Sequence, residues 1–140
     1  MTEKVSWRAQ MALGYAPLDE EHEAFIPVVN EALEVLEKKD LVGAEDVFDK
    51  CYAFARTHFS HEEALMEKLD YPDIMAHMKS HQIFIKNISE LRQLYEFAPE
   101  DEKMEVFEQL ANFLNVWFIG HVLSRDSLLK PFLKSLPPEA

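Results

Sequence analysis

The chain has 140 residues, of which 48% are hydrophobic, and it carries a formal net charge of −12. This length suits one domain with a sizeable core, and the negative charge argues against nucleic acid and anionic membranes as partners, because both require a basic surface. No window approaches the ~20 apolar residues of a membrane span, and the single cysteine, Cys51, cannot form an internal disulfide, so we expect a cytoplasmic protein.

The composition favours an all-α fold. Only three glycines interrupt the chain, and Ala, Leu, Glu, Lys and Met are abundant in long stretches with no strand-like alternation. Residues 1–17 lack helical periodicity but contain Trp7 and Tyr15. They predict an ordered arm that lies across the domain, anchored by Trp7; a disordered leader is the alternative.

The first helix is predicted over residues 19–38. Asp19 and the two glutamates after it place negative charge at the positive end of the helix dipole. Apolar residues recur at helical spacing through this segment, and His22 lies in the same stripe.

The second helix is predicted over residues 44–69, where apolar residues recur every three or four positions. His58 and Glu62 interrupt this seam four positions apart, which places them on one face of the helix. A buried carboxylate without a partner is costly or becomes protonated, so Glu62 requires a counter-charge. A cation is the simplest one.

The third helix is predicted over residues 72–97, with Pro72 in its first turn. His77 and His81 take apolar positions in its inner seam, again four apart, and Ile85 is expected to continue that seam. Because the turn before this helix is short, the second and third helices should pack antiparallel. Both pairs of polar side chains then face one interior.

The fourth helix is predicted over residues 101–129 and carries His121 in its apolar stripe. Asp126 follows five positions later, about 140° round an ideal helix from His121, too far to share a metal with it comfortably. Either Asp126 is a surface residue or the helix is locally widened. Gly120, a weak helix former, favours a π-bulge or a close approach to a bulky cluster.

Four helices joined by short turns predict an up-down-up-down antiparallel four-helix bundle with an N-terminal arm. We expect one domain over residues 1–140. Pro131 is expected to end the fourth helix, and residues 131–140 to form a short C-terminal tail.

Five of the six histidines fall on the inward stripes of four different helices. A lone histidine in such a stripe is more often a hydrogen-bonded core residue, but five in seams of Leu, Ile, Phe and Val would lack partners. Together they indicate a metal site. The sixth, His61, lies about 100° round the helix from Glu62 and should be exposed. Glu63 is expected to be solvated or to support a ligand, and Cys51 to be a core residue.

Four motifs together resemble the signature of the hemerythrin family, specifically its single-domain bacterial members. They are His22, HFxxEE at 58–63, HxxxH at 77–81 and HxxxxD at 121–126, and the likeness spans residues 7–129. The resemblance implies a four-helix bundle that holds two iron ions without haem.

The resemblance also implies a role for each ligand. Glu62 and Asp126 would bridge the two irons beside an oxo or hydroxo group. Three histidines, His77, His81 and His121, would complete the coordination of one iron.

His22 and His58 would serve the other iron, which would keep an open position for dioxygen. Five residues would form the walls of that oxygen pocket, although plain core packing explains them equally: Phe25, Phe59, Trp117, Phe118 and Val122.

The function that this resemblance implies is reversible dioxygen binding for transport, storage or delivery. The protein would be a monomer that is not an enzyme, with dioxygen as its ligand and an oxygen-accepting enzyme as a possible partner. The alternatives are an oxygen or redox sensor that acts through a partner, a di-iron enzyme acting on peroxide or nitric oxide, and a metal-free structural bundle.

Overall fold

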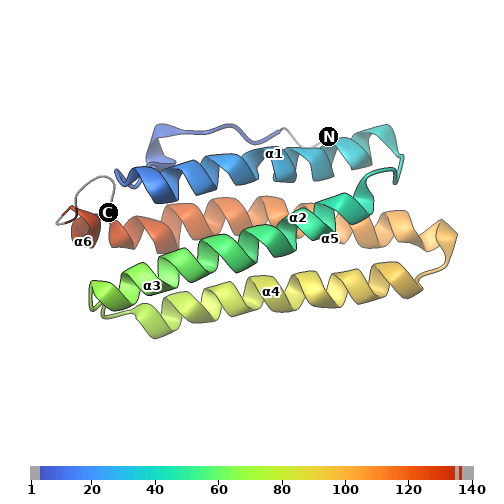
Figure 1. Cartoon of the computed structure of the whole chain (residues 1–140). Coiled ribbons are helices and arrows are strands. Elements are labelled where there is room, and N and C mark those ends of the chain that lie inside the picture. The colour runs from blue at the N-terminus through green and yellow to red at the C-terminus, as the bar shows by residue number, and fades with distance from the viewer. Residues whose placement is uncertain (1–3, 135, 137–140) are drawn as a thin grey trace.

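The computed structural model describes residues 4–134 and 136, which form the predicted all-α four-helix bundle with an N-terminal arm (Figure 1). Four rods run up, down, up and down. The first is α1 (Ala16–Lys38), and the second is α2 (Ala44–Phe54) joined to α3 (Ser60–Lys68) through a π-helical turn over Ala55–Phe59. The third rod is α4 (Ile74–Phe97) and the fourth begins with α5 (Lys103–Gly120).

The fourth rod changes its helical form three times after α5. A π-helical turn spans His121–Arg125, a 3-10 segment spans Asp126–Leu129, and α6 follows over Lys130–Leu133. The prediction that Pro131 ends the helix is therefore wrong. Pro131 lies in the first turn of α6, where a missing backbone N–H leaves no hydrogen bond unmade. Of the predicted tail, residues 135 and 137–140 lie outside the described part of the chain.

Helix α1 begins three residues before the predicted start. Pro17 occupies its first turn, where proline is favoured. The Asp19 carboxylate accepts hydrogen bonds from the backbone N–H groups of Leu13 and Gly14, at 2.8 and 3.2 Å. The acidic side chain lies in the first turn of the helix, as predicted, and it also holds the arm to the helix.

Helix α4 begins two residues later than predicted, because Asp70 adopts a left-handed conformation (φ 51°) and the next three residues complete the turn. Its inner seam also differs by one position. Ile85 is 43% exposed, whereas Phe84 is fully buried. The seam steps by three residues after His81, so it includes Phe84 and Ile88 and leaves Ile85 on the outside.

The arm packs against the bundle along α1 (Figure 1). Val5 exchanges two hydrogen bonds with the side chain of Asn30, at 2.6 and 2.8 Å, and Trp7 packs partly buried against the core. Met11 and Leu13 are buried. Residues 1–3 lie outside the described part of the chain.

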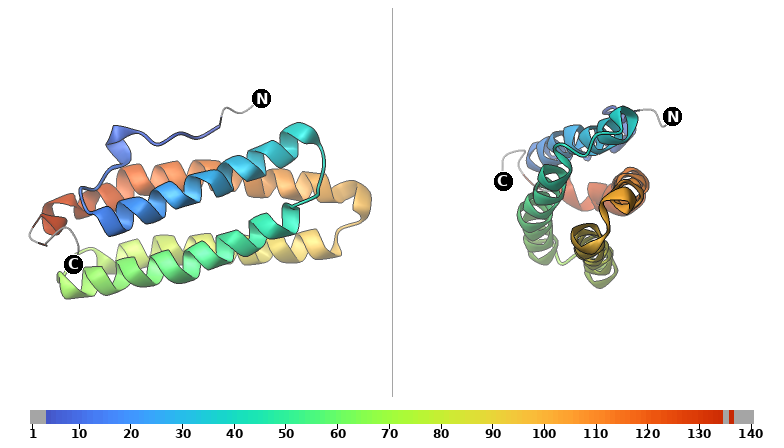
Figure 2. Two further views of the ribbon diagram at one scale, coloured as in Figure 1. Left: turned by 45° about the horizontal axis from the view of Figure 1, so that its top comes forward. Right: turned by 90° about the vertical axis from the view of Figure 1, so that its right-hand side faces the viewer.

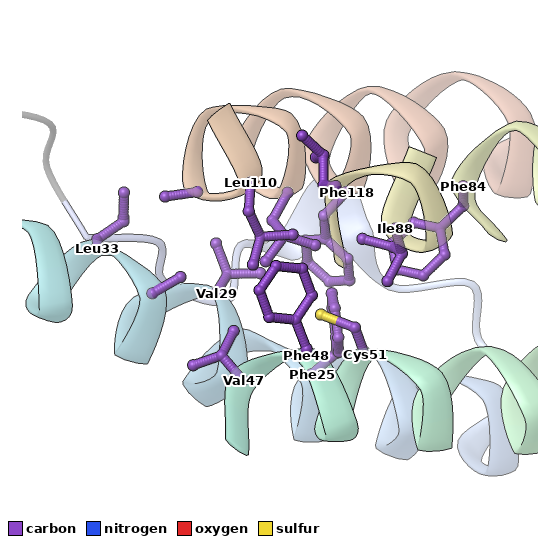
Figure 3. Packing of buried hydrophobic residues seen from close by; sticks show 14 of the residues in the cluster. Phe25, Val29, Leu33, Val47, Phe48, Cys51, Phe84, Ile88, Leu110 and Phe118 are labelled. Atoms are coloured by element: carbon purple, nitrogen blue, oxygen red, sulfur yellow. The ribbon is translucent and has the colours of Figure 1, made fainter. Parts of the chain in front are cut away.

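Two apolar clusters fill the bundle. The larger occupies most of its length and contains Phe25, Phe48, Phe84 and Cys51, whose packing Figure 3 shows. The smaller cluster closes the end at which the second rod turns into the third. Its buried members include Leu18, Met66, Tyr71 and Leu129. In each rod the predicted metal ligands lie between members of the two clusters. No helix in the described residues is long and apolar enough to cross a membrane.

The four rods enclose the core when viewed along the bundle axis (Figure 2). Helix α1 packs on α2 and α5, and α4 packs on α5, α2 and α3. Each rod therefore packs against two adjacent rods. Inward side chains of all four rods can meet at the same position along the bundle axis.

Candidate metal centre

Seven polar side chains meet in a layer between the two apolar clusters, and each is at most 5% exposed. They come from all four rods. They are the seven ligands predicted from the sequence: His22, His58, Glu62, His77, His81, His121 and Asp126.

The seven side chains form two overlapping groups, each with ligand atoms within 4.8 Å of one another. One group contains three histidines and the other two. Glu62 and Asp126 belong to both groups. The arrangement can therefore hold two cations side by side, with both carboxylates shared between them.

The two oxygens of each carboxylate face different histidines. Oε1 of Glu62 lies 2.5 Å from Nε2 of His77 and 2.9 Å from Nε2 of His81. Oδ1 of Asp126 lies 2.9 Å from Nε2 of both His77 and His121. These contacts define the three-histidine side of the centre.

The remaining oxygens face the two-histidine side. Oε2 of Glu62 lies 3.2 Å from Nε2 of His58, and Oδ2 of Asp126 lies 2.9 Å from Nε2 of His22. The two Nε2 atoms of His22 and His58 are 2.9 Å apart. Each carboxylate therefore spans the two sides in the manner of a bridging ligand.

Several of these short contacts are not aligned as hydrogen bonds. Nε2 of His121 and both carboxylate oxygens of Asp126 are buried and have no hydrogen-bond partner within the described chain, although His121 and Asp126 approach to 2.9 Å. Buried polar atoms normally pair with one another. Atoms that instead converge on a common point are arranged as ligands of a cation, so the residues present fit a metal.

The π-helical turn explains how Asp126 joins the centre. It adds a residue between His121 and Asp126, which turns both side chains inward, and Asp126 is fully buried. Of the two alternatives, the locally widened helix is therefore correct. Gly120 precedes the turn, and a Cβ at this position would meet nothing within 4 Å, so close packing does not account for the glycine.

The outer nitrogens of three imidazoles are held by partners from other helices. Carboxylates can only accept, so Nδ1 of His58 donates to Glu21 at 2.7 Å and Nδ1 of His81 donates to Glu63 at 2.8 Å. Nδ1 of His121 pairs with Ser80 at 2.8 Å. These contacts orient Nε2 of each ring toward the centre.

Sequence reasoning anticipated Glu63 in such a role but missed Glu21 and Ser80. Glu21 had been assigned only to the charge at the start of the helix. Its second carboxylate oxygen bonds His61 Nδ1 at 2.7 Å, and His61 is exposed, as predicted. No pattern within one helix indicates these partners, because they reach across from a neighbouring helix.

Aromatic rings cover the centre. Phe59 stacks on His81 with centroids 3.9 Å apart, and Trp117 stacks on His121 at 4.4 Å, so both lie against the three-histidine side. Phe118 meets His22 edge-on at 6.3 Å.

The two other residues predicted as walls, Phe25 and Val122, are buried and belong to the larger apolar cluster. Sequence reasoning missed Phe54 as a wall. Its ring stacks on His58 with centroids 4.8 Å apart. The signal was present, since Phe54 precedes His58 by four positions in the same seam.

Contacts within the centre favour protonated imidazoles when no metal is bound. Burial lowers the pKa of His58, but its hydrogen bond to Glu21 and the negative charge of Glu62 outweigh burial and raise that pKa to about 9. The pKa of His77 also rises to about 9, because Asp126 and Glu62 outweigh burial. The pKa of His121 is raised in the same way, mainly by Asp126.

The two carboxylates shift in the opposite direction. Burial raises the pKa of Glu62, but the surrounding imidazoles, His121 and His58 foremost, bring it well below its usual value. Burial and the nearby Glu62 raise the pKa of Asp126, and the positive charge of His121 outweighs them. Protons on the imidazoles thus supply the positive charge that metal ions would supply.

Replacing Glu21 with alanine is expected to weaken metal retention by about 10- to 100-fold, the usual cost of losing a partner that orients a ligand. His58 would lose the acceptor that directs its Nε2 inward. Competition with a chelator measures the change. Glu20→Ala, at an exposed neighbouring position, is the matched control. Glu21→Gln should recover part of the loss, since its amide oxygen still accepts from His58; wild-type retention in Glu21→Ala would contradict the role.

Comparison with known proteins identifies the family of the chain. The profile of the hemerythrin HHE cation binding domain matches residues 13–133. The chain is 28% identical to a bacteriohemerythrin of Stenotrophomonas maltophilia over 120 residues, which cover 86% of this chain and 75% of the relative.

Two other bacteriohemerythrins show similar likeness. One, from Ralstonia nicotianae, is 29% identical over 136 residues, covering 97% of this chain and 93% of the relative. Another, from Aquifex aeolicus, is 27% identical over 110 residues, covering 79% and 82%. The segment that the domain profile matches includes every residue of the candidate centre. The chain therefore belongs to the hemerythrin family.

Proposed function

We propose that the chain binds two iron ions in the buried centre and binds dioxygen reversibly there, for transport, storage or delivery of oxygen. The observation that carries this proposal is the pair of overlapping ligand groups, unequal in their histidines and joined by two shared carboxylates. A site for one cation would not need both carboxylates to direct one oxygen toward the three-histidine side and the other toward the two-histidine side. The similarity to bacteriohemerythrins supports the choice of iron and dioxygen.

The residues divide into three roles. His77, His81 and His121 would fill one metal position, and His22 and His58 would hold the other. Glu62 and Asp126 would bridge the two positions. Imidazole suits iron, and carboxylate oxygens suit bridging between hard cations. The side with two histidines has fewer protein ligands, so we assign dioxygen to that side.

Two ferrous ions, when bound, supply the electrons that dioxygen takes up on binding and returns on release. The chain must keep water and stray protons away during this exchange. The stacked rings of Phe59 and Trp117 shield the three-histidine side, and Phe54 shields His58. Apolar clusters close the layer above and below.

We place this function in the cytoplasm and in a monomer. The thiol of Cys51 is fully buried, and burial raises its pKa, so it is protected from oxidation and from pairing with another chain.

The test is anaerobic reconstitution with ferrous iron, followed by repeated cycles of dioxygen and vacuum. We expect two irons per chain, and an absorption band in the visible range that appears with dioxygen and disappears without it. The zinc-loaded chain, which cannot donate electrons, is the control. Irreversible oxidation in every cycle would contradict the proposal, and steady consumption of dioxygen with an electron donor would favour an enzyme instead.

A further inference from the structure

A cavity of about 300 Å³ opens between α1 and α2 and ends at the metal centre. Apolar side chains form most of its walls, with Ala24, Phe25 and Val28 on α1 and Ala53 and Phe54 on α2. The buried side chain of His58 also lines it. The cavity therefore leads to the side of the centre that has two histidines.

The ring of Phe54 forms the part of the cavity wall next to His58. It stacks on Phe25 with centroids 4.0 Å apart, and on His58 at 4.8 Å. Phe54 is only partly buried, although Phe25 and His58 are fully buried. A rotation of this one side chain would widen the passage from the cavity past His58 toward the other ligands of the two-histidine side.

A second cavity, of about 360 Å³, lies along the same side of α1, toward α3. Glu21 lines both cavities. Its carboxylate is bound to His58 and His61 and so forms a polar wall between the two. The second cavity has His61 and Lys68 in its walls and does not reach a predicted metal ligand.

We infer that the cavity between α1 and α2 is the entrance by which small apolar molecules reach the two-histidine side, and that the Phe54 ring is its gate. A mostly apolar passage offers few hydrogen bonds to water and so favours apolar solutes. The one cation in the walls, Lys50, is paired with Glu31 and Asp46 at 2.8 and 3.0 Å, so it does not attract anions into the passage. That dioxygen is the molecule admitted rests on the proposed function.

Bulky residues at the mouth test the entrance. Ala53 and Ala24 are exposed and lie on opposite walls, so Ala53→Trp and Ala24→Trp fill the passage without removing a core contact. The matched control is Ala64→Trp, because Ala64 is an exposed alanine in the wall of the second cavity.

The kinetic readout uses the iron-loaded chain and dioxygen. We expect both tryptophan variants to slow association and dissociation of dioxygen equally, by about tenfold or more, since a barrier on the path raises the activation free energy in both directions. The equilibrium affinity should stay unchanged. An unchanged association rate in both variants, or an equal slowing in Ala64→Trp, would overturn the inference.

Phe54→Ala removes the proposed gate, so the rates of dioxygen association and dissociation should both rise. Its matched control is Phe113→Ala, another partly buried phenylalanine, which packs on Phe84 away from the cavity. Circular dichroism establishes that each variant is folded. Equal rates in Phe54→Ala and the wild type would show that the ring is no gate.

Xenon provides a readout that needs neither iron nor dioxygen. With the metal-free full chain in solution, xenon pressure should shift the NMR signals of the Ala24 and Ala53 methyl groups and leave that of Ala64 in place. Ala53→Trp should abolish the shift at Ala24. Xenon binding with no reversible dioxygen binding would retain the entrance and reject the proposed function, whereas absence of xenon from this cavity would reject the entrance.

Discussion

Replacing Glu62 with alanine is expected to remove both metal ions at once. Each side of the centre takes one oxygen from this carboxylate, so its loss leaves both groups incomplete. It also removes one of the two negative charges that balance the bound cations. Losing a partner that only supports a ligand costs about 10- to 100-fold in affinity, so losing a shared ligand should exceed this range for both ions.

Metal content after desalting, measured by elemental analysis, distinguishes a shared ligand from one that serves a single side. Glu62→Ala should retain almost no iron, whereas His22→Ala should spare the three-histidine side and retain about one iron per chain, because a site that keeps all its ligands keeps its affinity. Glu67→Ala, an exposed position on the same helix, should retain the wild-type content. Retention of one tightly bound iron by Glu62→Ala would contradict the bridging role.

The affinity of the centre for metal should rise steeply between neutral pH and about pH 9. His58 and His77 have pKa values raised to about 9 in the metal-free fold, so both are protonated at neutral pH. A metal ion must displace these protons to reach Nε2. If binding displaces two protons, the apparent affinity for metal should rise about 100-fold for each pH unit up to pH 9.

The stability of the metal-free chain should follow the opposite trend. The raised pKa values of His58 and His77 stabilise the fold below about pH 6.5, the unfolded value for histidine, and this stability is lost as pH rises through about 9. The lowered pKa values of Glu62 and Asp126 contribute stability above about pH 4, lost as pH falls further. The metal-free chain should therefore be most stable between about pH 4.5 and pH 6.5.

Urea unfolding of the metal-free and metal-loaded chains across this range, with metal competition at each pH, measures both trends. His58→Gln should lower the slope of the affinity against pH by about one proton. His61→Gln keeps a donor to Glu21 and leaves the slope unchanged, so it is the control. The raised pKa values of His58 and His77, about 9, set the upper end of the pH range in which metal affinity should change. A metal affinity that does not change between pH 7 and pH 9 would contradict protonated imidazoles in the metal-free centre.

The long helices were predictable because each carries an apolar seam with helical spacing, and burial of that seam drives the packing. The same rule pointed to the candidate ligands, since His58 and Glu62, or His77 and His81, occupy seam positions that apolar residues would otherwise fill. Helix ends were less predictable. Pro131 illustrates the reason, because proline either stops a helix or begins one, and only the preceding 3-10 segment decides which.

By itself, the sequence determined the bundle and the family resemblance, and it predicted six of the seven side chains of the candidate centre, because these depend on residue type and on spacing within one helix. Spacing alone left the position of Asp126 open. The tertiary structure alone decided between the two positions of Asp126, through the π-helical turn that brings it inward. It also decided which oxygen of each carboxylate faces which histidines, and that Glu21 and Ser80 hold the outer nitrogens of His58 and His121. These relations join different helices, and their geometry is set by how the four rods pack around the core.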